Sequence, residues 1–181
     1  MNGNNVTKNA LAASLKTLMQ ERSFDKISVS DICEHCGMNR KSFYYHFKDK
    51  YDLVNWIFYV DFVGSMDIQS YRTGWDLLSD LCKHFYADRR FYRAALKITG
   101  QNSFHDYILE TLRPILIYMV RDMYPEEEMQ QFFADFVGDA FLTAVMRWLD
   151  SGMIMEPEVF LDHMKKAGIA ISSAILREEA E

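Results

Sequence analysis

The chain has 181 residues, of which 49% are hydrophobic and 25% are charged, and its formal net charge at pH 7 is −6. A chain of this length and composition can bury a sufficient core without disulfides or a structural metal. Three cysteines, an odd number, and a start without the features of a secretory signal predict a location in the reducing cytoplasm. No apolar run approaches the roughly 18 to 20 residues that a membrane-spanning helix needs, so the sequence predicts no such helix.

The charges are distributed unevenly along the chain. Residues 1–50 contain eight Lys and Arg and five Asp and Glu, a balance of +3, which leaves 12 basic and 21 acidic residues, a balance of −9, for residues 51–181. An acidic protein is a poor partner for nucleic acid because phosphate contacts require cations. The basic N-terminal segment in front of an acidic one nevertheless indicates a nucleic-acid-binding module joined to a second module.

The N-terminal segment predicts helices in quick succession. Glycine and proline are scarce, at eight and three, and apolar residues recur at steps of three and four, which predicts an all-α chain. The first helix is expected from Thr7 to about Glu21. Ser28 and Asp31 have the spacing of a capping box, so a second helix is expected from Val29. Gly37 is expected to end it, because glycine tolerates the left-handed conformation found after a helix.

A third helix follows after Asn39, which suits an N-cap. Phe43 and Phe47 lie four residues apart and are expected to share the face that packs against the first two helices. Two short helices joined by a glycine turn form a helix-turn-helix. The remaining side chains of the third helix then point outward, and they carry cations, hydroxyls and an imidazole that can contact base edges and phosphates: Arg40, Lys41, Ser42, Tyr44, Tyr45 and His46.

From Thr7 to Ile57 the chain resembles the TetR/AcrR transcriptional regulators. The resemblance rests on the capped second helix, the turn glycine and the third helix with its continuation: Ser28, Val29, Asp31, Ile32, Gly37, Arg40, Ser42, Phe43, Tyr44, His46, Phe47, Lys48, Lys50 and Leu53. It implies homodimers with a helix-turn-helix DNA-binding domain, here residues 1–50, and a helical effector-binding and dimerisation domain, here residues 51–181. By position, Arg40, Lys41 and Tyr45 would contact bases. Four others would contact phosphates, with Ser30 near the groove: Ser42, Tyr44, His46 and Lys50.

The acidic remainder predicts further helices. We expect a helix capped by Asp49, two short ones within residues 75–98, and longer ones over residues 103–123 and 129–148 and from Pro157 onward. The helix over residues 129–148 is apolar on more than one face and needs cover on both sides. We therefore predict that the last two helices pair with their copies around a two-fold axis, although a tightly packed monomer is the alternative. The predicted interface residues are Phe133, Phe136, Val137, Ala140, Ala144, Trp148, Met164 and Ile171.

The middle helices are rich in aromatic residues and methionine, which is typical both of a ligand pocket and of a plain core. If a small-molecule effector binds, Tyr107, Arg113 and Tyr118 are the residues expected to face it. A weaker likeness, carried by Ile27 to Ile32 and by Trp56, Ile57, Phe58, Asp61 and Phe62, is to the branch of dihydroxyacetone kinase regulators. This branch includes an activator that works through a partner protein, so a regulator acting through a protein partner is the alternative.

Other site signals are weak. Cys33 and Cys36 have the spacing of zinc and redox motifs, but no second pair of ligands lies nearby, so we expect both to pack as small hydrophobic residues and Cys82 to be a core thiol. We predict no metal and no cofactor. Common catalytic motifs are absent from the sequence, and we predict no enzyme; a small helical enzyme using His84 and His105 is the minor alternative. The favoured function is a ligand-responsive homodimeric repressor that binds a palindromic operator.

Overall fold

The computed structural model describes residues 3–100, 103–152 and 154–178, and all of their regular structure is helical, which confirms the all-α prediction. Three short 3-10 segments lie at Phe24–Lys26, Val63–Ser65 and Ile68–Ser70. The α-helices of the described residues are α1 (Gly3–Glu21), α2 (Val29–His35), α3 (Arg40–His46), α4 (Lys50–Asp61), α5 (Gly74–Ala87), α6 (Arg89–Ala95), α7 (Phe104–Val120), α8 (Glu127–Asp150) and α9 (Pro157–Glu178). None of them is long and apolar enough to cross a membrane.

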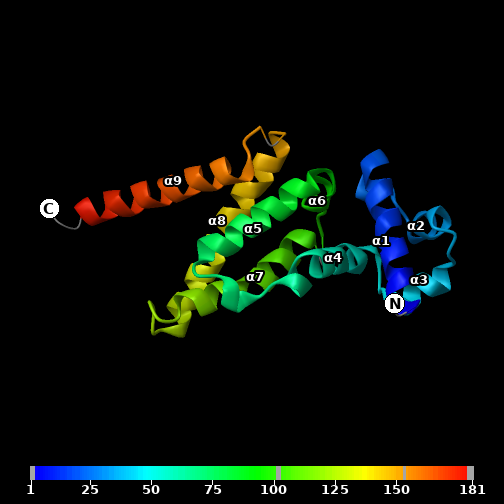
Figure 1. Cartoon of the computed structure of the whole chain (residues 1–181), viewed down its shortest axis with the longest axis horizontal. Coiled ribbons are helices and arrows are strands. Elements are labelled where there is room, and N and C mark those ends of the chain that lie inside the picture. Colours follow the sequence, from blue (N-terminus) through cyan, green and yellow to red (C-terminus); the bar gives the residue numbers. More distant parts are fainter. Residues whose placement is uncertain (1–2, 101–102, 153, 179–181) are drawn as a thin grey trace.

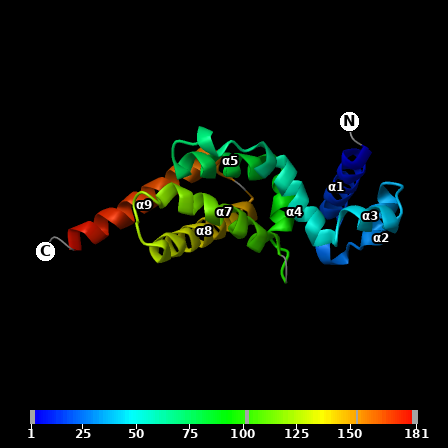
Figure 2. The same cartoon turned by 90° about the horizontal axis from the view of Figure 1, so that it is seen from below.

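The helices form an elongated molecule with two different ends. Helices α1, α2 and α3 lie together at one end, and α4 leads from them into the body formed by α5 to α8 (Figure 1). At the opposite end α9 extends away from the body as a single arm, which the second view also shows (Figure 2). The DNA-binding prediction and the dimer prediction therefore concern opposite ends of the chain.

Local side-chain caps define the short helices. Ser28 Oγ accepts a hydrogen bond from the backbone N–H of Asp31 at 3.1 Å, and the Asp31 carboxylate accepts one from the backbone N–H of Ser28 at 2.7 Å, so the predicted capping box is present. Gly37 has φ +68°, a conformation that is costly for other residues. Asp49 caps α4 by accepting from the backbone N–H groups of Tyr51 and Asp52, both at 2.9 Å.

The centre of the body is packed with aromatic rings. Phe58 of α4 is 0% exposed, and its ring centroid lies 5.5 Å from that of Phe62 and 5.5 Å from that of Phe104. Tyr92 of α6 is also fully buried, with its ring 4.8 Å from that of Phe85. The aromatic residues at this position are thus core, one of the two interpretations that the sequence left open.

Helix α9 diverges from α8 instead of packing along it. Its N-terminal part is held by Trp148 of α8, whose ring stacks on Phe160 at 4.5 Å and on Tyr86 at 6.0 Å, and whose Nε1–H donates to the carbonyl of Met155 at 2.9 Å. The helix that α9 mainly contacts is α5. Trp148, predicted at an interface between subunits, is 2% exposed and therefore packs within its own chain.

Candidate nucleic-acid interface and regulatory surfaces

Helix α3 is fixed in place by its own cap and by a buried face. The Asn39 side chain accepts from the backbone N–H of Ser42 at 2.9 Å, which begins the helix as predicted. Phe43 is 0% exposed and Phe47 is 3% exposed, so the face that they share is covered by the neighbouring helices. A buried hydrogen bond from Ser14 Oγ of α1 to the carbonyl of Ile32 at 2.7 Å joins α1 to α2. The outward face of α3 consequently has a defined orientation.

Four of the predicted DNA-contacting side chains lie on this outward face. Arg40 and Lys41 are exposed, and Tyr44 and Tyr45 are 51% and 81% exposed. The Arg40 guanidinium lies 5.7 Å from the ring centroid of Tyr44 and donates to the Tyr44 hydroxyl at 3.4 Å. A face that combines phenol hydroxyls with two cations is suited to a polar, anionic partner.

The other four predicted residues are placed differently. Ser30 and His46 are half-buried, and the His46 ring stands edge-on to Tyr45 at 4.9 Å. Ser42 is also half-buried and directs its hydroxyl back to Asn39 Oδ1 at 3.3 Å. The structure therefore brings the eight residues to one end of the molecule but exposes them unequally.

Lys50 has partners within its own chain that the sequence did not predict. Its ammonium donates to the carbonyls of Phe24 and Ile27, both at 2.8 Å, and lies 4.2 Å from the ring centroid of Phe24. Desolvation by burial lowers the pKa of Lys50 below its ordinary value of 10.5. In the free protein this lysine ties the start of α4 to the segment between α1 and α2, instead of presenting its charge to solvent.

Lys16 of α1 is a further linking residue that sequence reasoning missed. Its ammonium lies 2.9 Å from a carboxylate oxygen of Asp61 at the end of α4 and 2.9 Å from one of Asp88, between α5 and α6. The ring centroid of Phe91 is 5.1 Å away. These partners are far apart along the chain, so no local spacing could have indicated the contact.

The cysteines behave as the sequence predicted. Cys33 is 2% exposed, and desolvation raises the pKa of its thiol. Cys82 is 0% exposed, and burial raises its pKa to about 12. Cys36 is half-buried, and its thiol donates to the carbonyl of Ile32 at 3.2 Å. Over the part of the chain that the structure describes, no group of three or more His, Cys, Asp or Glu residues could hold a metal ion.

The two histidines of the minor enzyme hypothesis are in unrelated surroundings. His84 Nε2 is 2.6 Å from the hydroxyl of Tyr92 inside the aromatic core, and burial lowers the pKa of this histidine below 6.5. His105 lies near the start of α7, with its Nδ1 3.3 Å from the carboxylate of Asp106. Neither arrangement presents a nucleophile together with an oriented base.

The three residues predicted to face an effector are not brought together. Tyr107 is half-buried and lines a polar cleft between α4 and α7. Arg113 is exposed and forms an ion pair with Asp135 of α8 at 2.7 Å. Tyr118 is 50% exposed, and the Arg121 guanidinium lies 4.1 Å from its ring centroid. A single molecule in the aromatic centre could not contact all three.

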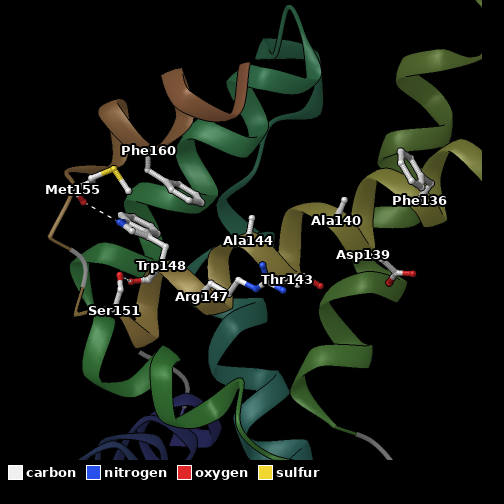
Figure 3. Close-up of a pocket in the computed structure, with 10 residues that line it drawn as sticks. All are labelled: Phe136, Asp139, Ala140, Thr143, Ala144, Arg147, Trp148, Ser151, Met155 and Phe160. Carbon is white, nitrogen blue, oxygen red and sulfur yellow. Dashed lines mark hydrogen bonds between the residues drawn. The ribbon is translucent and has the colours of Figure 1, made fainter. Parts of the chain in front are cut away.

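Two hollows occur elsewhere in the body. The first, which we call the apolar groove, has a volume of about 550 Å³ and lies between α5, α7, α8 and α9. The second, the α8–α9 pocket, has a volume of about 650 Å³ and is open on one side (Figure 3). Of the predicted interface residues, Phe133, Val137 and Met164 line the groove, Ala144 and Trp148 line the pocket, and Phe136 and Ala140 line both.

A helix-turn-helix with an exposed cationic and aromatic face, followed by a helical body, defines a DNA-binding transcriptional regulator. Residues 10–57 match the family model of bacterial regulatory proteins of the tetR family, and residues 75–167 match a model of a transcriptional regulator C-terminal region. The second model alone spans just over half of the chain. The chain therefore belongs to the tetR family of bacterial transcriptional regulators.

Individual relatives support the same assignment. The chain is 27% identical over 105 residues to the HTH-type dhaKLM operon transcriptional activator DhaS of Lactococcus lactis subsp. lactis, a match that spans 58% of this chain and 56% of that relative. The solved structure of a dihydroxyacetone kinase operon activator DhaS is similar with a TM-score of 0.65 at 21% identity, covering 91% of this chain and 95% of that one.

NalD of Pseudomonas aeruginosa, the secondary repressor of the MexAB-OprM multidrug efflux pump, is similar with a TM-score of 0.65 at 14% identity, covering 92% and 95% of the two chains. At these identities the two solved structures establish the fold alone. One is an activator and the other a repressor, so the shared fold does not decide between the two roles.

Proposed function

We propose that this regulator binds a palindromic operator as a homodimer, with α3 of each subunit in the major groove, and that an effector controls its affinity. The observation that carries the proposal is the outward face of α3, on which Arg40, Lys41 and Tyr45 are exposed beside a buried phenylalanine face. Exposed arginine and lysine can donate to guanine edges, while tyrosine hydroxyls are suited to phosphate oxygens. We place the boundary between DNA-binding and regulatory domains at residues 50 and 51, and the protein in the cytoplasm, where bacterial DNA lies.

The experiment for DNA binding begins with selection of bound sequences from random DNA. Arg40→Ala and Lys41→Ala are then compared with the wild type on the selected operator. A lost base contact weakens binding by about 1–3 kcal/mol, and a lost phosphate contact lowers the salt slope by about 0.9. Arg90→Ala is the matched control, because Arg90 is an exposed cation of α6 in the body. Unchanged affinity and slope in both α3 variants would refute the proposed contacts.

We assign different roles to Lys50 and Ser42 than their sequence positions suggested. The Lys50 ammonium already has two carbonyl acceptors, and the Ser42 hydroxyl is directed to Asn39, so both support the position of α3 and α4. Lys50→Met is expected to lower thermal stability together with operator affinity, whereas Lys41→Ala is expected to lower affinity alone. If Lys50→Met has an unchanged melting temperature and a reduced salt slope, Lys50 contacts a phosphate, as its sequence position suggested.

The proposed homodimer is supported by apolar side chains that the chain leaves uncovered on α8 and α9. Phe132 and Phe136 of α8 are 63% and 64% exposed, and Ile169 and Ile171 of α9 are 66% and 63% exposed. Because α9 diverges from α8, a second copy can insert its own α8 and α9 between them and cover the α8–α9 pocket (Figure 3). Of the predicted interface residues we retain Phe133, Phe136, Val137, Ala140, Ala144, Met164 and Ile171, and we assign Trp148 to the core.

Sedimentation tests the dimer. Phe136→Glu would bury a charge at the two-fold interface and is expected to produce monomers at micromolar concentration. Tyr59→Glu is the matched control, since Tyr59 is 51% exposed and belongs to α4, whose main contacts are with α1, α7 and the segment Val63–Ser65. Wild-type protein that sediments as a monomer would refute the dimer and favour the alternative of a self-contained chain.

The second candidate is a regulator that responds to a partner protein instead of a small molecule. Two observations favour it: the aromatic centre is filled, and the sequence is similar to a transcriptional activator of the dhaKLM operon. Adding metabolite fractions to the protein on its selected operator separates the two candidates. Release or tightening of DNA by a small-molecule fraction supports direct sensing, whereas a response that requires a protein fraction supports the partner.

A further inference from the structure

The apolar groove has a shape suited to an elongated, mostly apolar molecule. Its volume of about 550 Å³ falls within the roughly 300–1,000 Å³ of small-molecule sites. Trp75 and Leu78 of α5 form one wall, and Phe133 and Val137 of α8 form the other. On the side of α9 the lining includes Gly168, which has no atom within 4 Å of the position that a Cβ would occupy, so the groove stays open there.

One end of the groove is polar and cationic. A second, smaller hollow of about 220 Å³ adjoins it, and the two share Arg72, Thr73, Gly74 and Met119 in their linings. This second hollow, which we call the polar end, is also lined by Tyr71, Tyr118, Arg121 and Asp122. The charged side chains in the two linings are Arg72, Arg121 and Asp122. The carboxylates of Asp76 and Asp80 lie beside the linings, the first against the backbone of Arg72 and Thr73 and the second against the Tyr71 hydroxyl.

Among the described residues, the one ion pair of these two guanidinium groups is the contact of Arg121 with Asp122. The Asp122 side chain is 93% exposed, and its oxygen is 3.7 Å from Arg121 Nε, a long contact on the solvent side. The Arg121 guanidinium lies 4.1 Å from the ring centroid of Tyr118, which fixes its plane and leaves its edge free to donate. Asp76 is nearby but accepts the backbone N–H groups of Arg72 and Thr73, so it caps α5.

We propose that the groove and its polar end together form one binding site for an amphiphilic carboxylate, with the apolar tail in the groove and the carboxylate at Arg72 and Arg121. The proposal rests on the effector-responsive regulator proposed above and names the chemical class of its effector. The groove provides apolar burial of the tail, and the guanidinium groups match the carboxylate in charge and in donor geometry. A cationic or neutral amphiphile would gain the first contribution without the second.

Ligand binding at this site can also change the affinity of the protein for DNA. Its α8 wall contains Phe133, Phe136, Val137 and Ala140, which are residues of the proposed dimer interface. If the two subunits can adopt two arrangements, a tail bound against this wall makes different contacts in each of them. The ligand then favours the arrangement that it binds more tightly, and with it one spacing of the two α3 helices. Tyr118, one of the residues that the sequence predicted to face an effector, lies at the polar end of this site.

The test is calorimetric titration of the full-length protein with decanoate, below the concentration at which it forms micelles, and with decan-1-ol, below its solubility limit in water. The two probes have the same tail and differ in the charged group. We expect decanoate to bind about tenfold or more tightly than decan-1-ol, which corresponds to a charge-assisted contact. Arg72→Met and Arg121→Met should each weaken decanoate binding severalfold and leave decan-1-ol binding unchanged. Arg90→Met, which removes an exposed cation of α6, should change neither.

A groove-filling variant tests the position of the tail. Gly168→Leu places a side chain at the open side of the groove on an exposed turn of α9, and we expect it to weaken binding of both probes without lowering the melting temperature, because leucine has a higher helix propensity than glycine. Wild-type protein that binds neither probe, equal affinity for the two probes, or full decanoate affinity in both arginine variants would each overturn the proposal. Absence of binding by a protein that sediments as a dimer would overturn the ligand site and leave the proposed homodimer intact.

The same protein samples are also titrated with the selected operator. Operator binding without decanoate binding refutes the ligand site and leaves the proposed DNA contacts intact. Decanoate binding without sequence-specific DNA binding refutes the proposed regulator function and leaves the ligand site intact.

Discussion

Lys16 is the residue whose replacement tests most directly how the DNA-binding helices are joined to the body. It belongs to α1, whereas its two carboxylate partners belong to α4 and to the junction of α5 and α6, with both contacts at 2.9 Å. Burial alone would lower the pKa of Lys16, but the hydrogen bonds to Asp61 and Asp88 outweigh it and raise the pKa above 10.5. The charged form is therefore stabilised by folding, and Lys16→Met removes this stabilisation while keeping an apolar stem.

The expected loss of unfolding free energy in Lys16→Met follows from the burial of the three charged side chains. Hydrogen bonds to charged groups contribute about 1.5–3 kcal/mol each when they are well buried. The Lys16 side chain is 28% exposed, and those of Asp61 and Asp88 are 39% and 35% exposed, so solvent screening reduces each contact toward about 0.5–1 kcal/mol. We expect Lys16→Met to lower the free energy of unfolding by about 1–2 kcal/mol, which corresponds to about 2–4 °C in melting temperature for each kcal/mol.

Urea denaturation of Lys16→Met, Asp88→Asn and the double variant measures the contact itself as a coupling free energy. Lys83→Met is the matched control, because the Lys83 ammonium is 50% exposed and lies 3.9 Å from the carboxylates of Asp80 and Glu158. The raised pKa also fixes the pH dependence: the contribution is fully present at neutral pH and is lost only as the pH rises above 10.5. A coupling free energy of zero, or a loss no greater than in Lys83→Met, would refute the reasoning.

Three further predictions concern the core, the α8–α9 connection and the helix-turn-helix. Because burial lowers the pKa of His84 below 6.5, the unfolded chain binds the proton more readily, so stability should fall as the pH falls from 7.5 through 6.5, and His84→Gln should remove this slope in urea denaturation. Trp148→Phe keeps an aromatic ring against Phe160 but loses the hydrogen bond to Met155, and should lower the free energy of unfolding by about 1–3 kcal/mol; an unchanged value would show that this bond is replaced by water. Ser28→Ala removes the hydroxyl that caps α2 and should cost about 1 kcal/mol by thermal denaturation, whereas Ser70→Ala, in a 3-10 segment of the body, should cost less.

The secondary structure of the N-terminal segment was predictable because its signals are local. Ser28 and Asp31 cap each other within one turn, Asn39 caps the next helix, and Gly37 adopts the positive φ for which glycine is suited. Each of these interactions joins residues at most three positions apart, so the sequence pattern contains the whole interaction. The outward positions of Arg40, Lys41 and Tyr45 followed from the same argument, since the buried positions of α3 are four residues apart.

Long-range contacts give other side chains surroundings that the sequence did not predict. Lys50 was expected to face phosphates, but carbonyl groups from residues 24 and 27 lie within 2.8 Å of its ammonium only after α4 has packed beside them. Trp148 was expected between subunits, but it is covered by Tyr86 and Phe160 of its own chain. Tyr107, Arg113 and Tyr118 lie on one helix, yet their surroundings differ: a polar cleft, an ion pair with α8 and the polar end.

The sequence by itself determined the helical fold, the helix-turn-helix and the residues that α3 exposes, because caps, turns and apolar spacing act over a few residues. The tertiary structure decided where the grooves and pockets lie and how the DNA-binding helices are joined to the body. Aromatic residues that could have lined a ligand site fill the centre around Phe58, and the open volume lies instead between α5, α7, α8 and α9. Cavities and ion pairs such as that of Lys16 depend on the crossing of distant helices, which local spacing does not encode.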